Sequence, residues 1–336
     1  MMRLPRFSYR TPTTVGEAAT ILAGEGPDAM LLAGGTDLVP NMKRRQQTPK
    51  TVVALRGVGA LRDVSHGFGL TLGAGLTLTD VVQDPRIRER HAGLWQAAAQ
   101  VATPHLRNMG TLGGNLCLDT RCTYYDQNLE WRRAIDFCMK KDGETCWVAP
   151  GSPRCLAVSS TDTAPALMAL DAHVKLVSKQ DERVVPLTDL YANDGIDYLT
   201  RRPDEILTAV LLDEDGDRRS AYWKLRRRGS FDFPVLSVAA SARFGPDGET
   251  VEDARVVLGA VASRPQPSEP AANVIVGKAL TDAVIEEAAE AAARVAKPMD
   301  NTDFTLHGRK RVAREVVTYA LREIRGDDRR TTRVRI

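Results

Sequence analysis

The stretch Ala29-Met30-Leu31-Leu32-Ala33-Gly34-Gly35-Thr36-Asp37 is a short apolar run that ends in a glycine pair. Such a run predicts a buried strand followed by a tight loop. A second glycine pair lies further along the chain, in Thr111-Leu112-Gly113-Gly114-Asn115. Because glycine has no Cβ, backbone N–H groups in these loops can approach a phosphate closely. Either pair alone is compatible with a simple turn, but the two together predict phosphate-binding loops.

Neither loop fits a common nucleotide-binding motif. The segment Gly73-Ala74-Gly75 lacks the third glycine and the helix of a Rossmann loop, and the lysine of a Walker motif is also absent. A dinucleotide bound by these loops would therefore require a different fold.

The cysteines are confined to one part of the chain. Cys117 is followed by Cys122, Cys138, Cys146 and Cys155, and these five are all that the chain contains. Structural zinc sites usually contain two cysteines separated by two to four residues, and ferredoxins have close spacings of their own. The last four cysteines have neither spacing. They predict four converging thiolates without naming the ion, and the alternative is a set of ordinary buried or surface thiols.

Composition narrows the class of protein. Among 336 residues, 46 are Lys or Arg and 43 are Asp or Glu, a balance that argues against nucleic-acid binding. No apolar run approaches the roughly 18 residues of a membrane span, and the N-terminus has no signal-peptide core. We therefore expect a cytoplasmic protein, where clustered cysteines more often bind metal than form disulfides.

The hydrophobic pattern predicts an α+β chain in two parts. A helix is expected after Thr14, and strands over 51–55, 70–75 and 173–177. Three more strands, over 221–226, 235–244 and 254–261, are followed by helices over 283–296 and 310–325. The expected divisions are a first domain over 1–215, with subdomains of about 1–57 and 58–215 and an insertion over 117–159, then a second domain over 216–326 and a basic tail over 327–336.

Several motifs occur in an order that resembles the FAD-binding subunits of the xanthine dehydrogenase and carbon monoxide dehydrogenase family. They are the two glycine loops, Ser160-Thr161-Asp162-Thr163-Ala164-Pro165, Trp223-Lys224-Leu225-Arg226 and Gly259-Ala260-Val261. The resemblance implies an α+β fold with a two-part FAD-binding domain and a C-terminal three-stranded sheet with helices.

The same resemblance implies which residues contact FAD. The glycine loops would hold the pyrophosphate, Asp162 would face the ribose or diphosphate, Leu207 the flavin edge, and Lys224 the flavin or its anion. The implied cofactor-binding residues are Ala33, Gly34, Gly35, Thr36, Asp37, Thr111, Gly113, Gly114, Asn115, Asp162, Leu207 and Lys224. No residue suggests itself as a catalytic group.

The cysteine-bearing insertion is a departure from most of this family, whose members have only a short connection there. In this feature the chain resembles the flavin subunits of 4-hydroxybenzoyl-CoA reductases. That resemblance implies a [4Fe–4S] cluster on Cys122, Cys138, Cys146 and Cys155, with Cys117 as a spare.

The resemblance also implies partners and a direction of electron flow. The partners would be a molybdenum-cofactor subunit and a [2Fe–2S] subunit, in a dimer of heterotrimers. Electrons from a low-potential donor such as ferredoxin would pass through FAD toward molybdenum, for the reductive dehydroxylation of 4-hydroxybenzoyl-CoA to benzoyl-CoA in anaerobic aromatic degradation. The alternatives are the FAD subunit of an oxidising molybdenum hydroxylase with a zinc-bearing or empty insertion, and a stand-alone flavin reductase of similar fold.

The insertion also carries many charged and aromatic residues. We expect its positive side chains to form a solvated face, with steering of an acidic electron donor as the alternative. The aromatic residues would form either a small core or a shell around the cluster. The positive residues are Arg121, Arg132, Arg133, Lys140 and Lys141, and the aromatic ones are Tyr124, Tyr125, Trp131, Phe137 and Trp147.

Overall fold

The structure is a computed structural model that describes residues 3–67, 69–213 and 218–328. The chain forms two compact units, each built from three separate segments. The first unit contains Met1–Asp80, Pro104–Ala157 and Ala172–Glu214, and the second contains Val81–Thr103, Val158–Asp171 and Asp215–Ile336. The predicted basic tail lies outside the described residues from position 329 onward.

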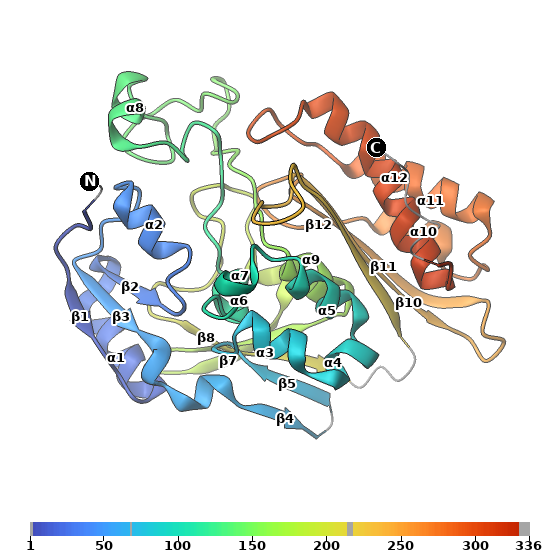
Figure 1. Cartoon of the computed structure of the whole chain (residues 1–336), viewed down its shortest axis with the longest axis horizontal. Coiled ribbons are helices and arrows are strands. Elements are labelled where there is room, and N and C mark those ends of the chain that lie inside the picture. Colours follow the sequence, from blue (N-terminus) through green and yellow to red (C-terminus); the bar gives the residue numbers. More distant parts are fainter. Residues whose placement is uncertain (1–2, 68, 214–217, 329–336) are drawn as a thin grey trace. The chain divides into compact units, whose positions relative to one another are not determined.

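A three-stranded parallel sheet lies in the first unit, in the order β1-β3-β2 (Figure 1). The elements are β1 (Ser8–Arg10), α1 (Val15–Glu25), β2 (Ala29–Leu32) and β3 (Thr51–Ala54). Helix α1 packs Ala18, Ala19 and Leu22 against the buried strand β3. It begins as predicted, because the Thr14 hydroxyl accepts a hydrogen bond from the Glu17 N–H at 3.1 Å.

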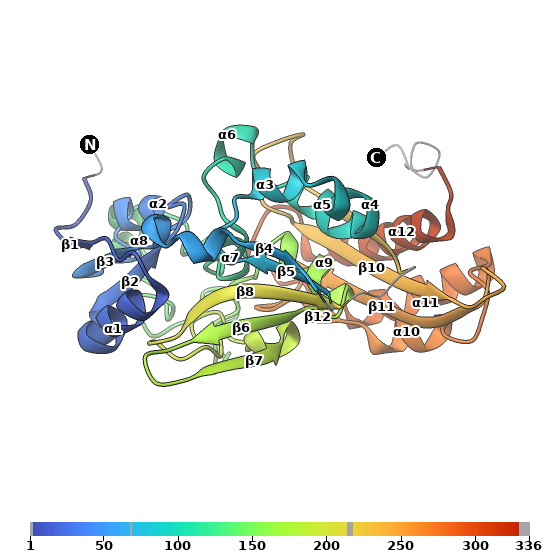
Figure 2. The same cartoon turned by 90° about the horizontal axis from the view of Figure 1, so that it is seen from below.

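A five-stranded antiparallel sheet is the second sheet of this unit, in the order β4-β5-β8-β6-β7 (Figure 2). Its strands are β4 (Val64–His66), β5 (Gly69–Gly73), β6 (His173–Val177), β7 (Glu182–Pro186) and β8 (Ile206–Asp213). The central strand β8 was not among the predicted strands, although its apolar residues from Ile206 to Leu212 are typical of a buried strand.

Short helices complete the first unit. They are α2 (Leu38–Lys43), α6 (Pro104–Arg107), α7 (Leu112–Leu116) and α8 (Leu129–Ala134), while α3 (Leu78–Gln83) contains the boundary between the units. Helix α8 belongs to the cysteine-bearing insertion. The insertion reaches α2, where Arg132 donates to the carbonyl of Arg44 at 2.8 Å.

The second unit is built on a four-stranded antiparallel sheet in the order β12-β11-β10-β9. The three predicted strands are present and the two-residue strand β12 is added. The elements are α4 (Pro85–Arg90), α5 (Ala92–Ala99), α9 (Thr163–Ala169), β9 (Arg219–Leu225), β10 (Leu236–Phe244), β11 (Val251–Gly259), β12 (Gln266–Pro267), α10 (Glu269–Ile275), α11 (Asp282–Val295) and α12 (Leu306–Arg325).

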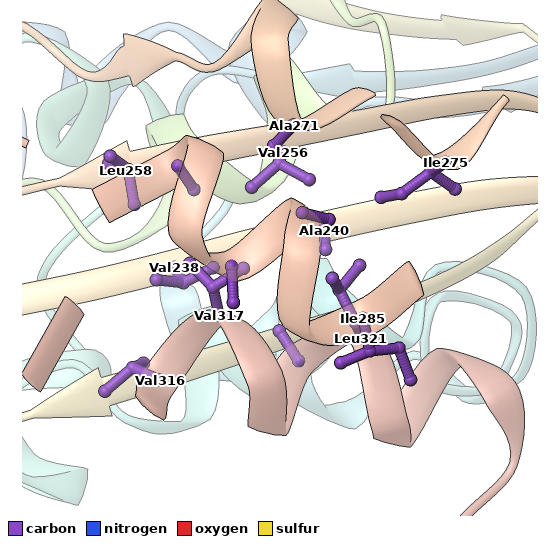
Figure 3. Packing of buried hydrophobic residues seen from close by; sticks show 14 of the residues in the cluster. Val238, Ala240, Val256, Leu258, Ala271, Ile275, Ile285, Val316, Val317 and Leu321 are labelled. Carbon is purple, nitrogen blue, oxygen red and sulfur yellow. The ribbon is translucent and has the colours of Figure 1, made fainter. Parts of the chain in front are cut away.

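Side chains of β10 point alternately to the two faces of this sheet, and each face contacts its own helices. Val238 and Ala240 belong to the core shared with α10, α11 and α12, where Ile285 and Val317 also pack (Figure 3). Ser241, on the other register, donates to the carbonyl of Ala169 in α9 at 2.5 Å. Helix α12 begins one turn before the predicted position.

Among the described residues, no helix combines the length and the apolar character needed to cross a membrane.

Candidate functional site

The structure brings the two glycine loops into contact within the first unit. A Cβ on Gly34 would lie 1.8 Å from the carbonyl oxygen of Met109, and one on Gly110 would lie 3.4 Å from the Thr36 hydroxyl. A Cβ on Gly114 would lie 3.9 Å from the Cβ of Ala33. Residues 33–37 and 106–114 are therefore neighbours, as a shared phosphate site requires.

Three of the four predicted phosphate-binding glycines are required by the packing of the chain itself. A Cβ on Gly34 would overlap Met109, and a Cβ on Gly113 would lie only 2.7 Å from the Cβ of Ala74. Gly35 has a left-handed φ of 73°, which side chains rarely allow. Gly114 differs, because the nearest obstacle to its Cβ is the Thr111 hydroxyl at 2.9 Å, the end of a side chain. Among these four, Gly114 is therefore the glycine that neither a backbone overlap nor a left-handed φ requires.

The two glycine loops also differ in how many of their backbone N–H groups are already hydrogen-bonded. Gly113 N–H donates to the carbonyl of Ala74 at 2.8 Å, and Gly114 N–H donates to the Thr111 hydroxyl at 3.1 Å. The N–H groups of Gly34, Gly35 and Thr36 have no acceptor in the described part of the chain. The first loop therefore presents the unused donors, and Thr111 acts as the cap of α7.

Asp37 joins the first glycine loop to the cysteine-bearing insertion. Its carboxylate forms an ion pair with Arg121 and accepts from the Asp119 N–H at 3.3 Å. Burial raises the pKa of Asp37, and the charge of Arg121 opposes that rise. Asp37 thus has a structural role in positioning the insertion. Asn115, in α7, is buried.

Asp162 and Lys224 lie in the second unit and contact each other. The Lys224 ammonium is 3.0 Å from the Asp162 carboxylate, and Tyr222 donates its hydroxyl to the same carboxylate at 2.6 Å. Burial raises the pKa of Asp162 and lowers the pKa of Lys224, and their mutual attraction opposes both shifts. Leu207 lies in β8 of the first unit and is buried.

The cysteines of the insertion divide into two groups. Cys122, Cys138 and Cys155 belong to one buried apolar cluster with Tyr125 and Ala157, and Cys146 is buried as well. Cys117 is only partly buried and lies outside this cluster, at the end of α7. In the ranges that the structure describes, no group of three or more His, Cys, Asp or Glu side chains is arranged to hold a metal ion.

Burial has a strong effect on the pKa of two of these thiols. It raises the pKa of Cys122 to about 12 and that of Cys155 to about 11. Besides burial, charges on the other thiols contribute to both rises in pKa, with Cys155 and Cys138 acting on Cys122, and Cys146 and Cys138 acting on Cys155. The four thiols are thus close enough to influence one another, and burial keeps the thiols of Cys122 and Cys155 protonated unless a cation is bound.

Comparison with known proteins identifies the fold and the family. Residues 5–212 match the model of the FAD binding domain in molybdopterin dehydrogenase, and residues 220–324 match the CO dehydrogenase flavoprotein C-terminal domain. The chain belongs to the family of FAD-binding medium subunits of molybdenum hydroxylases.

Relatives in this family include subunits of several enzymes. The aldehyde oxidoreductase FAD-binding subunit PaoB of Escherichia coli is 34% identical over 269 residues, which is 77% of this chain and 82% of PaoB. The carbon monoxide dehydrogenase medium chain of Hydrogenophaga pseudoflava is 27% identical over 94% of this chain and 96% of its own. A solved structure of that dehydrogenase, lacking the Mo-pyranopterin moiety, matches 95% of this chain and 97% of its own with a TM-score of 0.78 and 26% identity. The predicted α+β fold is confirmed.

The prediction of a solvated positive face on the insertion is wrong for three of its members. Arg132 is 1% exposed, and the side chains of Arg121 and Lys140 are 14% and 6% exposed. The sequence pattern missed this because a long cationic side chain is buried only where tertiary partners surround its charged end. The aromatic residues are also split, since Tyr125 is buried while Trp131 and Trp147 are exposed.

Two contacts of this flavin subunit were not predicted. Met109 passes over Gly34, and Gly195 packs against Cys155, whose carbonyl accepts from the Gly195 N–H at 2.9 Å. A Cβ on Gly195 would lie 2.7 Å from the Cys155 sulfur. A single glycine in a loop carries no sequence signal for such a contact, because the partner is distant along the chain.

Proposed function

We propose that this chain binds FAD through its two touching glycine loops and transfers electrons for a molybdenum hydroxylase complex. The observation that carries this proposal is the set of unused N–H groups of Gly34, Gly35 and Thr36, next to the loop of Gly114. Bound FAD would supply transfer of one or two electrons. The residues proposed around its pyrophosphate are Ala33, Gly34, Gly35, Thr36, Asp37, Thr111, Gly113, Gly114 and Asn115.

Asp162, Lys224 and Leu207 are proposed as further FAD contacts. The Asp162–Lys224 pair is almost neutral as a unit, so its role would be to position hydrogen-bonding groups more than to supply net charge. Leu207 would offer an apolar contact to the flavin edge.

We propose that Cys122, Cys138, Cys146 and Cys155 hold a [4Fe–4S] cluster in the insertion, with Cys117 outside it. Four buried thiols that influence one another are a donor set suited to this cluster.

For the partners we propose a molybdenum-cofactor subunit and a [2Fe–2S] subunit, in a dimer of heterotrimers located in the cytoplasm. Two of the relatives are known as a medium chain and as an FAD-binding subunit, which supports a multi-subunit enzyme. For the substrate, the cysteine-bearing insertion favours 4-hydroxybenzoyl-CoA, with ferredoxin as donor and electrons passing inward.

A second candidate is supported by the comparisons. The relatives described above are named for aldehyde oxidoreductase and carbon monoxide dehydrogenase, which favours an oxidising complex whose electrons leave through FAD. An aldehyde is the substrate class that the 34% identical relative suggests. In this candidate the insertion can still carry the cluster.

The test uses the complex purified with its partner subunits. FAD, iron, acid-labile sulfide and molybdenum are measured first, and the proposal requires one FAD and four cluster irons assigned to this chain. Turnover is then measured with aromatic aldehydes plus an electron acceptor, and with 4-hydroxybenzoyl-CoA plus reduced ferredoxin. Aldehyde oxidation alone would exclude the reductase. Absence of FAD from the chain would refute the central proposal.

A further inference from the structure

Lys140 is a buried cation held in place from several sides. Its ammonium donates to the Asp119 carboxylate at 2.9 Å, the Thr120 hydroxyl at 2.8 Å and the Gly195 carbonyl at 2.5 Å. It also lies 4.8 Å from the ring centre of Tyr125 and 5.5 Å from that of Tyr198. All three ammonium hydrogens therefore have acceptors, and two aromatic rings flank the charge.

This cation lies next to the cysteine cluster. The carbonyl of Gly195 accepts from Lys140, and the Cα of the same glycine lies against the Cys155 sulfur. The charge of Lys140 also opposes the effect of burial on the pKa of Cys155. Tyr125, under the ammonium, is a member of the apolar cluster that contains Cys122 and Cys138. The Asp119 carboxylate pairs with Lys140 and also contacts Tyr125 and Gln47.

A fixed cation beside a cluster of thiolates has a definite electrostatic effect. Reduction of a cluster held by these cysteines would add one negative charge to it, and the Lys140 ammonium, in surroundings of low dielectric constant, would stabilise that added charge. The potentials of iron–sulfur clusters respond to local charge, hydrogen bonds and solvent exposure. An ammonium that cannot be hydrated is screened less than the charges on the surface of the insertion.

We infer that Lys140 is a positioning residue that raises the reduction potential of the iron–sulfur cluster and thereby sets its electron exchange with the flavin. This inference rests on the proposed function, in which Cys122, Cys138, Cys146 and Cys155 hold that cluster. Asp119, Thr120 and the two tyrosines fix the ammonium at one place.

The experiment compares Lys140→Met with Lys141→Met in the assembled complex. Lys141 is the next residue and pairs with Asp142 at 3.5 Å, but its side chain is 32% exposed, so solvent screens its charge. Iron and sulfide content are measured for each protein, and the midpoint potential is followed by electron paramagnetic resonance during a redox titration. We expect Lys140→Met to keep its iron and to have a more negative cluster potential. In Lys141→Met the cluster potential should stay near the wild-type value, and the flavin potential should stay near it in both variants.

Two further variants keep the inference open to refutation. Lys140→Arg retains the charge and should restore most of the potential. Lys140→Gln replaces the ammonium by a neutral amide that can still form hydrogen bonds, and it should also have a more negative potential. An unchanged potential in the variants that lack the cation would overturn the inference, as would loss of iron from both of them while Lys141→Met keeps it, because Lys140 would then serve assembly. A wild-type complex without cluster iron would instead refute the proposed cluster itself.

Discussion

Gly114 is the residue at which folding and ligand binding can be separated. We expect Gly114→Ala to lose FAD while the chain stays folded, because its added Cβ meets only the end of the Thr111 side chain. Gly34→Ala should instead disrupt the first unit, since its Cβ would overlap the backbone of Met109. FAD absorbance after gel filtration and thermal unfolding of both variants check this. Full FAD occupancy in Gly114→Ala would contradict the assignment.

Cys138 and Cys117 provide a matched pair for the proposed cluster. Cys138→Ser should lower the iron content or convert the cluster, since a serine oxygen replaces one thiolate ligand. Cys117→Ser should leave iron near the wild-type level, because Cys117 lies outside the buried cluster of thiols. Iron analysis of the two variants shows which of these cysteines is a cluster ligand. Equal iron loss in both would show that the choice of four ligands among five cysteines is wrong.

Glu205 is a buried carboxylate that connects β7 to the start of β8. It accepts from the Arg183 guanidinium at 2.6 and 2.9 Å and from the Arg202 N–H at 2.6 Å. Burial raises its pKa, but the hydrogen bonds and charges of Arg183 and Arg202 outweigh burial, so the pKa lies below its usual value. Its stabilisation is therefore complete above the unfolded pKa and is lost as the pH falls through the lower folded pKa.

The prediction for Glu205→Gln follows from that pairing. We expect a loss of about 1–3 kcal/mol in the free energy of unfolding at pH 7, from weakened charge-assisted hydrogen bonds. The loss should shrink as the pH falls from the usual pKa of a glutamate, about 4.3, through the lower pKa of the folded carboxylate. Urea unfolding at a series of pH values measures the free energy of unfolding of both proteins. Glu182→Gln is the control, because its ion pair with Lys175 is largely exposed, and an equal effect of the control would refute the prediction.

At the scale of elements, Arg309 joins α12 to the sheet of the second unit. Its buried guanidinium donates to the carbonyls of Val235 and Met299, both at 2.8 Å, and to the carbonyl of Ala260. Arg309→Met would leave these carbonyls unpaired, at a cost of roughly 1–3 kcal/mol each. We expect a clear fall in the melting temperature, whereas the exposed Arg311→Met should change it little. Similar melting of both variants would count against this role.

At the scale of the whole molecule, the chain is expected to carry electrons without acting on a substrate. The isolated chain should bind FAD and accept electrons from dithionite, and should show no turnover with aldehydes or with 4-hydroxybenzoyl-CoA. The reason is that no residue of this chain is proposed to bind molybdenum or to act on the substrate. Steady-state assays of the chain alone check this. Measurable turnover would refute the division of labour between subunits.

The sequence by itself determined the elements whose signals are local. The cap at Thr14, the strands of the second unit and the glycine pairs could be read directly, because caps, alternation and missing Cβ atoms are properties of neighbouring residues. The ordered motifs also led to the correct family. The strand β8 was missed although its apolar run was visible.

Tertiary structure alone decided what depends on partners distant along the chain. It placed Met109 over Gly34, paired Asp162 with Lys224, and buried Lys140 between Asp119 and Gly195. The physical reason is that a charged or glycine residue has no fixed role until its surroundings are known. A lysine is solvated on a surface, but beside a carboxylate and two aromatic rings it becomes a fixed interior charge.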